Sequence, residues 1–219
     1  MPRIIFIRPA ETDQVAKYLG REDPDLSEIG RWQAVATARE LSRYPLHFLG
    51  TTPLKRAIST ALDISDEQDG LSPHPVAGFL GADLGEWKNL TIEEIRQSDR
   101  ARYDSWRSDP DFRAPGGESM REVYGRAFSD LANIVHGCHP EENLAFVLQE
   151  TVLQAMVCGA LDLPLSAGQR FAIDHAAYAV FERAYPEGPY IMIAWNRNEH
   201  LKHASLAETE LEELPLAGF

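Results

Sequence analysis

The sequence predicts a single α/β domain, a three-layer α/β/α sandwich with a mostly parallel sheet and a small helical insertion. Two observations carry this prediction. Apolar, strand-like runs alternate with helix-like segments along the chain, as in sheets covered by helices on both faces. The length of 219 residues, with 44% hydrophobic and 25% charged residues, suits one well-cored globular domain.

The first half of the chain contains two strand and helix pairs. Residues 2–8 carry the apolar run IIFI, which indicates a buried strand. Residues 26–44 have apolar side chains at helical spacing, and Ser27 is placed to cap that helix. A short strand over 47–51 and a helix over 53–65 follow, the latter with a proline near its first turn.

The second half continues the alternation after an excursion. The charged helical segment 90–106 belongs to an expected insertion over about 84–114, and a longer helix is expected over 118–135. A strand over 144–148 and an apolar helix over 151–161 come next. Two strands, 178–184 and 190–195, flank the turn PEGP, which predicts an antiparallel pair.

The overall composition excludes several classes of partner and site. A net charge of −13 repels nucleic acid and anionic membranes, so an anion pocket would need a local concentration of arginines. The two cysteines form neither a disulfide framework nor a metal motif, and we expect no metal and no cofactor. With no apparent leader or membrane span, a cytoplasmic protein is expected. The acidic segment 207–219 is expected to be a tail beyond a domain over 1–206.

Five short motifs occur in a definite order along the chain. They are RPAET at 8–12, LSEIGRWQA at 26–34, TPLKRAISTA at 52–61, GEWKNLT at 85–91 and PGGES at 115–119. Together they resemble the histidine phosphatase superfamily, also called phosphoglycerate mutase-like. The resemblance covers nearly the whole domain and implies the phosphoglycerate mutase-like sandwich.

The same resemblance implies which positions would carry the chemistry. The family ends its first strand with Arg-His-Gly, and that histidine accepts the phosphoryl group; here Pro9 stands in its place. A second histidine, in a Ser-His-Gly stretch, corresponds to Gln149, and the acid that protonates the leaving group corresponds to Gly81. Of the core constellation, the two phosphate-binding arginines remain as Arg8 and Arg56.

These replacements remove the chemistry of the family mechanism. A proline ring offers no lone pair for attack at phosphorus, and a glutamine amide does not exchange protons near neutral pH. Glu150 takes the place of the small glycine and adds a negative charge; at ~4 Å and an effective dielectric near 20, its repulsion of an anion costs on the order of 4 kcal/mol. The sequence therefore predicts a degenerate member without phosphatase or mutase activity.

Three titratable residues remain as candidates for other acid–base chemistry. They are Glu11, Glu150 and His175. Asp174 could orient the His175 ring, but adjacent residues of an extended segment point to opposite sides, which weakens that pair. A loop histidine bonded to the backbone is the plainer interpretation of His175.

The expected ligand site consists of Arg8, Arg56, Gln149 and Trp87. Two guanidinium groups suit a phosphate, sulfate or carboxylate. The opposing interpretation is that Glu150 and Glu11 neutralise the arginines without any ligand. For Trp87 a lid over the pocket and ordinary packing of the insertion are equally supported.

Three functions are compatible with these residues. The first is a pseudoenzyme that uses the vestigial pocket to bind a small anionic or organic ligand, or a partner. The second is an enzyme with repurposed acid–base chemistry, or residual phosphatase activity, in the same pocket. The third is a purely structural role, and a homodimer is compatible with each of them.

Overall fold

The computed structural model describes residues 3–14, 17–183 and 188–202. They form one six-stranded sheet with the order β3-β2-β4-β1-β5-β6. Its strands are β1 (Arg3–Ile7), β2 (Phe48–Thr51), β3 (His74–Pro75), β4 (Leu144–Val147), β5 (Tyr178–Arg183) and β6 (Tyr190–Arg197).

The sheet is parallel at one side and antiparallel at the other. β1 and β2 flank β4 in parallel, with Ile4 and Phe48 both opposite Leu144, and β3 pairs in parallel with β2. β5 runs antiparallel to β1, and β6 antiparallel to β5. The predicted mostly parallel sandwich and the predicted antiparallel pair are both confirmed.

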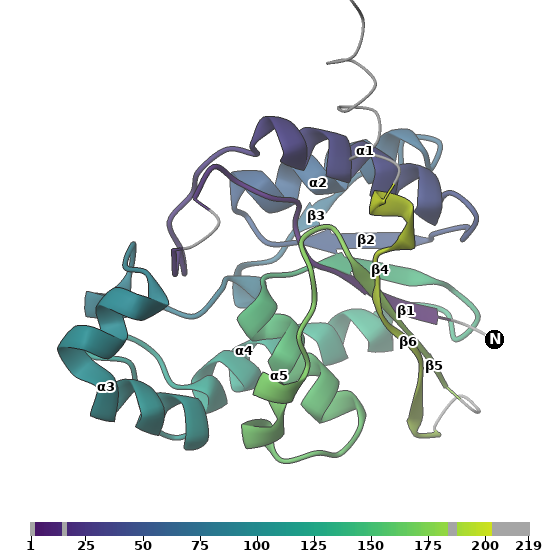
Figure 1. Cartoon of the computed structure of the whole chain (residues 1–219). Coiled ribbons are helices and arrows are strands. Elements are labelled where there is room, and N and C mark those ends of the chain that lie inside the picture. Colours follow the sequence, from purple (N-terminus) through teal and green to yellow (C-terminus); the bar gives the residue numbers. More distant parts are fainter. Residues whose placement is uncertain (1–2, 15–16, 184–187, 203–219) are drawn as a thin grey trace, which may run out of the picture.

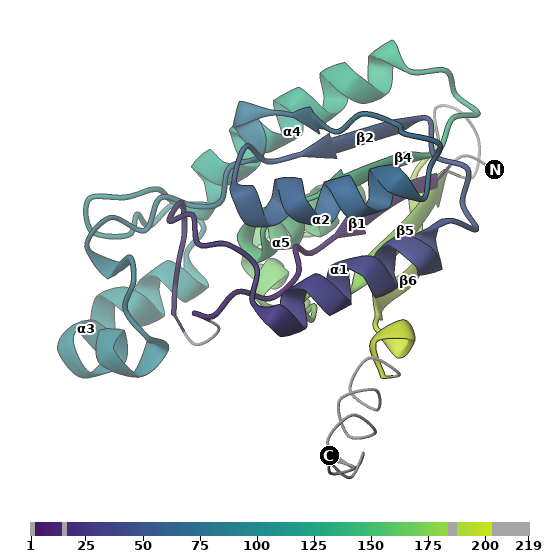
Figure 2. The ribbon, with the colours of Figure 1, turned by 90° about the horizontal axis from the view of Figure 1, so that it is seen from above.

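Two helices cover each face of the sheet (Figures 1 and 2). α1 (Glu28–Leu41) and α2 (Lys55–Asp66) lie on one face, while α4 (Met120–Gly137) and α5 (Glu150–Ala160) lie on the other. Side chains alternate along β1, so Ile5 packs in the α1/α2 core and Phe6 in the α4/α5 core. This two-sided burial explains why β1, β4 and β5 contain continuous apolar runs.

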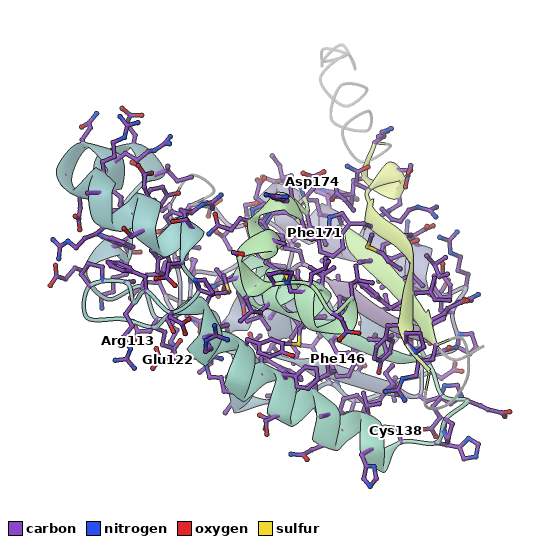
Figure 3. All side chains as sticks on the ribbon, turned by 90° about the horizontal axis from the view of Figure 1, so that it is seen from below. Arg113, Glu122, Cys138, Phe146, Phe171 and Asp174 are labelled. Atoms are coloured by element: carbon purple, nitrogen blue, oxygen red, sulfur yellow. The ribbon has the colours of Figure 1, made fainter. Side chains whose placement is uncertain are left out.

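Phe146 of β4 belongs to the larger core, between the sheet and the helices α4 and α5 (Figure 3). Its ring is fully buried and contacts three other rings, those of Phe6, Phe48 and Phe79, with centroids 5.6–6.0 Å apart. Phe79 belongs to the loop that leads to the pocket described below. The core therefore connects the sheet directly to that loop.

The segment 84–114 extends beyond the layers and contains α3 (Ile92–Ser108), seen at the side of the molecule in Figure 1. Capping boxes at Thr91 and Ser119 begin α3 and α4. In each box the N-cap side chain accepts a hydrogen bond from the backbone N–H of a glutamate three residues later, and the side chain of that glutamate accepts one from the N-cap backbone N–H. An ion pair between Arg113 and Glu122 joins the end of the segment to α4 (Figure 3).

Local patterns placed most helices and strands to within two residues, with a few exceptions. The expected helix over 26–44 is shorter, since Ser27 caps α1 and the helix ends at Leu41. β3 was missed because two residues give no periodic signal. The expected turn at 186–189 falls partly, and the acidic tail 207–219 entirely, outside the described residues. Among the described residues, no helix is long and apolar enough to cross a membrane.

Gly30 allows α1 to approach the chain that leaves β1. A Cβ atom at this position would lie 2.0 Å from the carbonyl oxygen of Glu11, so the backbone would have to move. We expect Gly30→Ala to lower the free energy of unfolding by about 1–3 kcal/mol, as overpacking does.

Gly125, inside α4, provides the matched control, because a Cβ atom there meets nothing within 4 Å. Gly125→Ala should be neutral or stabilise by up to about 1 kcal/mol, through helix propensity alone. Urea denaturation of both variants measures the difference. Equal effects of the two substitutions would contradict the packing role of Gly30.

Candidate functional site

A pocket of about 120 Å³ lies where the ends of β1 and β4 meet the starts of α2 and α5. This is the edge at which open α/β sheets bind ligands, because the carboxyl ends of parallel strands leave a crevice there. Arg8 and Pro9 follow the end of β1, Gln149 and Glu150 begin α5, and Arg56 lies in the first turn of α2. The topology thus brings together residues that are up to 142 positions apart in the sequence.

Arg8 has partners on three sides. One terminal nitrogen, Nη1, donates to the backbone carbonyl of Ile173. The other, Nη2, lies 3.1 Å from Nε2 of His175 and 3.2 Å from Oε2 of Glu150. Burial lowers the pKa of Arg8, and the charges of Glu150 and Asp174 oppose this effect. The guanidinium remains charged, since the pKa of arginine starts far above neutrality.

His175 is held as a neutral imidazole. Because a guanidinium can only donate, Nε2 accepts from Arg8, and Nδ1 carries the proton, 3.3 Å from the carbonyl oxygen of Pro9. Burial and the charge of Arg8 lower the pKa of His175 to about 4. Asp174 turns to other partners, the side chains of Asn196 and Asn198, as expected for neighbours on opposite sides of the chain.

Arg56 is buried and faces the same pocket. Its guanidinium donates to the backbone carbonyls of Gly20, at 3.0 Å, and of Glu22. Burial lowers its pKa, the charge of Asp23 opposes this, and the charge of Arg8 adds to it. Two arginines therefore face one cavity, and the carbonyl dipoles and the carboxylates of Glu150, Asp174 and Asp23 offset their burial only in part.

The first turn of α5 provides the third wall of the pocket. Gln149 occupies the N-cap position without capping the helix; its Nε2 donates to the Thr52 hydroxyl at 3.3 Å, and its Oε1 is buried without a partner among the described residues. Glu150 follows in the first helical turn, where a negative charge is favoured by the helix dipole. Its other oxygen, Oε1, accepts from Gln154 at 3.4 Å.

Pro9 and Gly81 also line the pocket. Pro9 presents only a hydrocarbon ring there. A Cβ atom at Gly81 would lie 3.0 Å from the carbonyl oxygen of Gly20 and 3.5 Å from Cβ and Cγ of Gln149, so this position lies close to both. Neither position carries a group that can take up or donate a proton.

A network of charged side chains holds the Gly81 loop in place. Arg126 of α4 donates to the carbonyls of Gly78, Leu80 and Gly81 at 2.6–3.0 Å. Arg126 also pairs with Glu118 at 2.9 Å. Partial burial disfavours the Glu118 carboxylate, but hydrogen bonds from Arg126 and the Asp83 N–H outweigh it and lower its pKa.

Two of the residues predicted for the site do not line this pocket. Trp87 is only 3% exposed, packs edge-on against Tyr103 and Trp106, and donates its indole N–H to Asp99 at 3.3 Å. Its large ring is buried in the core of the segment around α3 and does not line the pocket. Glu11 lines a neighbouring polar pocket, whereas His175 lines both pockets.

Other lining residues were missed by sequence reasoning. Lys17 and Tyr18 reach the pocket from the segment after β1, and Thr151 accepts from the N–H of Ala82 at 3.3 Å. The TPLKRAISTA motif pointed to Arg56, but no periodicity points to Lys17. Within the described residues, no group of three or more His, Cys, Asp or Glu side chains is arranged to hold a metal ion.

The low pKa of His175 predicts a pH-dependent stability. The unfolded chain takes up this proton near its ordinary pKa of 6.5, whereas the folded protein takes it up only near pH 4. Stability should therefore fall as the pH drops from about 6.5 to about 4, by on the order of 2–3 kcal/mol from this group. His175→Asn should remove that part of the slope, as measured by urea denaturation across this range. An unchanged slope would contradict the neutral assignment.

The comparisons with known proteins agree in family and in fold. A family model described as the histidine phosphatase superfamily (branch 1) matches residues 4–197. Phosphoserine phosphatase 1 of Hydrogenobacter thermophilus is 33% identical over 183 residues, which cover 82% of this chain and 86% of that protein. Glucosyl-3-phosphoglycerate phosphatase of Mycobacterium tuberculosis is 28% identical and covers 75% of this chain and 77% of its own.

Solved structures show the same architecture. A mycobacterial glucosyl-3-phosphoglycerate phosphatase in complex with VO3 superposes with a TM-score of 0.82 at 26% identity, over 90% of this chain and 99% of that one. A phosphoserine phosphatase mutant from Entamoeba histolytica in complex with phosphoserine has a TM-score of 0.79 at 21% identity, over 92% of this chain and all of that one. The latter likeness concerns the fold alone.

Proposed function

The chain belongs to the histidine phosphatase superfamily, and from this we propose that it keeps the anion pocket of the family but binds a small ligand there without transferring a phosphoryl group. It would act as a degenerate member, in which recognition at the end of the sheet persists after the loss of chemistry. Its named relatives are phosphatases, so this proposal concerns what this chain has changed.

One observation carries the proposal. The residue that β1 delivers to the pocket beside Arg8 is Pro9, whose ring has no atom able to attack phosphorus. The one imidazole among the described lining residues is that of His175, and its Nε2 lone pair accepts from Arg8. An imidazole in this arrangement has no free lone pair to direct at a bound phosphoryl group.

The remaining features of the pocket support binding. Arg8, Arg56 and the start of α5 surround one cavity with positive charge and helix-dipole potential, an arrangement that favours anions. The opening is partly polar and partly apolar, since Ala82, Leu84 and Tyr18 also line it. A small organic anion fits such a lining better than a bare inorganic ion does.

A second candidate function is an enzyme that uses His175 as a base. The low pKa of this histidine supports it, because a neutral imidazole at pH 7 is already in the basic form. Opening of the contact between Nε2 and Arg8 by a ligand would be required first. Under this alternative, His175→Asn abolishes an activity that Arg8→Ala merely weakens.

Hydrolysis and binding, measured together, test the proposal. We expect the wild-type protein to hydrolyse p-nitrophenyl phosphate no faster than Arg8→Ala does, and to be stabilised thermally by small organic anions when Arg8→Ala is not. Hydrolysis by the wild type that is lost in Arg8→Ala would overturn the proposal, as would equal thermal responses of the two proteins to every anion tried.

A further inference from the structure

The Glu150 carboxylate lies against the side of the Arg8 guanidinium that a bound anion would contact. Nη2 of Arg8 lies 3.1 Å from Nε2 of His175 and 3.2 Å from Oε2 of Glu150, and Nη1 donates to the carbonyl of Ile173. The contact with Glu150 is an ion pair, so the carboxylate opposes the charge of the guanidinium at the nitrogen that also contacts His175. A phosphate that approached Nη2 would therefore meet the Glu150 carboxylate as well as the guanidinium.

The position of Glu150 is fixed from more than one side. Its Oε2 pairs with Arg8, its Oε1 accepts from Gln154, and its backbone lies in the first turn of α5. The side chain remains 39% exposed and lines the pocket, so its charge acts on any ligand that enters. A fixed carboxylate in this place repels a dianion about twice as strongly as a monoanion at the same distance.

The size of the cavity also restricts the ligand. At about 120 Å³ it is well below the roughly 300–1,000 Å³ of pockets that hold drug-sized molecules. Its nearest cations are Arg8, Arg56 and Lys17, of which Arg8 is paired and Arg56 is bound to two carbonyls. These surroundings suit one negative charge on a small molecule.

We propose that Glu150 sets the charge of the ligand, so that the pocket takes a small monocarboxylate and discriminates against a phosphate dianion. The inference rests on the proposed function, since it names the ligand class of the same pocket. A glutamate at position 150, in place of the small glycine of the family, would thereby change the specificity of the pocket. The Glu150 carboxylate supplies to Arg8 part of the negative charge that a phosphate would supply.

The test compares two anions and three proteins by titration calorimetry at about pH 8, where inorganic phosphate is mainly a dianion. The probes are inorganic phosphate and acetate, and the proteins are the wild type, Glu150→Gln and Glu141→Gln. Glu141 is exposed and belongs to the loop before β4, at the opposite end of that strand, so its substitution changes the net charge equally without touching the pocket.

Removal of a fixed charge should favour a dianion twice as much, in free energy, as a monoanion. We therefore expect Glu150→Gln to tighten phosphate binding by about tenfold and acetate binding by only about threefold. Glu141→Gln should leave both affinities near the wild-type values. In the double variant Arg8→Ala, Glu150→Gln the gain for phosphate should disappear.

Equal gains for the two anions, no gain for phosphate, or no detectable binding of acetate by the wild type would each overturn the inference. Its failure can be distinguished from failure of the proposed function, because hydrolysis is measured separately. A protein that hydrolyses phosphate esters yet shows the expected charge discrimination contradicts only the proposed loss of catalysis.

Discussion

Arg126→Met is expected to lower the free energy of unfolding by about 3 kcal/mol or more, because it removes one partner from a largely buried network. The side chains of Arg126 and Glu118 are only 23% and 20% exposed. Without the guanidinium, Glu118 loses its hydrogen bonds from Arg126. The carbonyls of Gly78 and Leu80 lose the donor that Arg126 provides, and the Gly81 carbonyl keeps only Arg21. Methionine retains the stem of the side chain, so the loss reports mainly on charge and hydrogen bonding.

Arg121→Met is the matched control. Arg121 lies on the same helix and is also ion-paired, with Asp111, but both side chains are close to 60% exposed. Exposed pairs contribute about 1 kcal/mol or less, so this substitution should have a small effect. Chemical denaturation of both variants measures the contrast. Equal losses would show that Arg126 does not hold the loop in the way its contacts indicate.

The Arg126 network also affects the pocket. Gly81 and Ala82 line the cavity, and the carbonyl of Gly81 accepts from both Arg126 and Arg21. Arg126→Met should therefore weaken anion binding even at temperatures where the variant remains folded. A variant that is destabilised but binds acetate with wild-type affinity would confine the role of Arg126 to stability.

Hydrolysis of phosphoserine is expected to be slower than that of an active family member by about 10⁴-fold or more, in line with the cost of removing a nucleophile from a catalytic unit. Pro9 cannot form a covalent intermediate, and neither Gly81 nor Gln149 can protonate a leaving group near neutral pH. Because such residues act as a unit, the absence of the others adds little to the absence of the first.

An active phosphatase of the family, assayed under the same conditions, is the positive control for this measurement. The variant His175→Asn is the internal control, because it removes the one imidazole among the described lining residues of the pocket. Equal background rates in the wild type and in His175→Asn are the expected result. A faster rate in the wild type would assign catalysis to His175.

The sequence predicted the fold well because the information was local. Apolar runs marked the strands, and cap residues such as Ser27 and Ser119 marked the starts of helices. Arg8 and Arg56 were found through motifs that end a strand and open a helix, and the structure brings both to one cavity. Their place at one pocket was implied by the resemblance of those motifs to the family.

The partners of the site residues could not be predicted in this way. The contact of His175 with Arg8 depends on how β5 pairs antiparallel with β1, which brings positions 167 residues apart within hydrogen-bond distance. The burial of Trp87 depends on aromatic packing around α3, and the hold of Arg126 on the Gly81 loop on the packing of α4. Such contacts are set by tertiary structure and leave no periodic trace in the sequence.

The most direct test of the proposed loss of catalysis is to trap a phosphorylated protein. Wild-type protein is mixed with radiolabelled phosphoserine, quenched within one turnover under alkaline conditions that preserve phosphohistidine, and assayed for label bound to the chain. Because Pro9 has no attacking atom and Nε2 of His175 accepts from Arg8, we expect no label above that of the Arg8→Ala variant. Label that is retained by the wild type and mapped to His175 would contradict the proposed loss of catalysis.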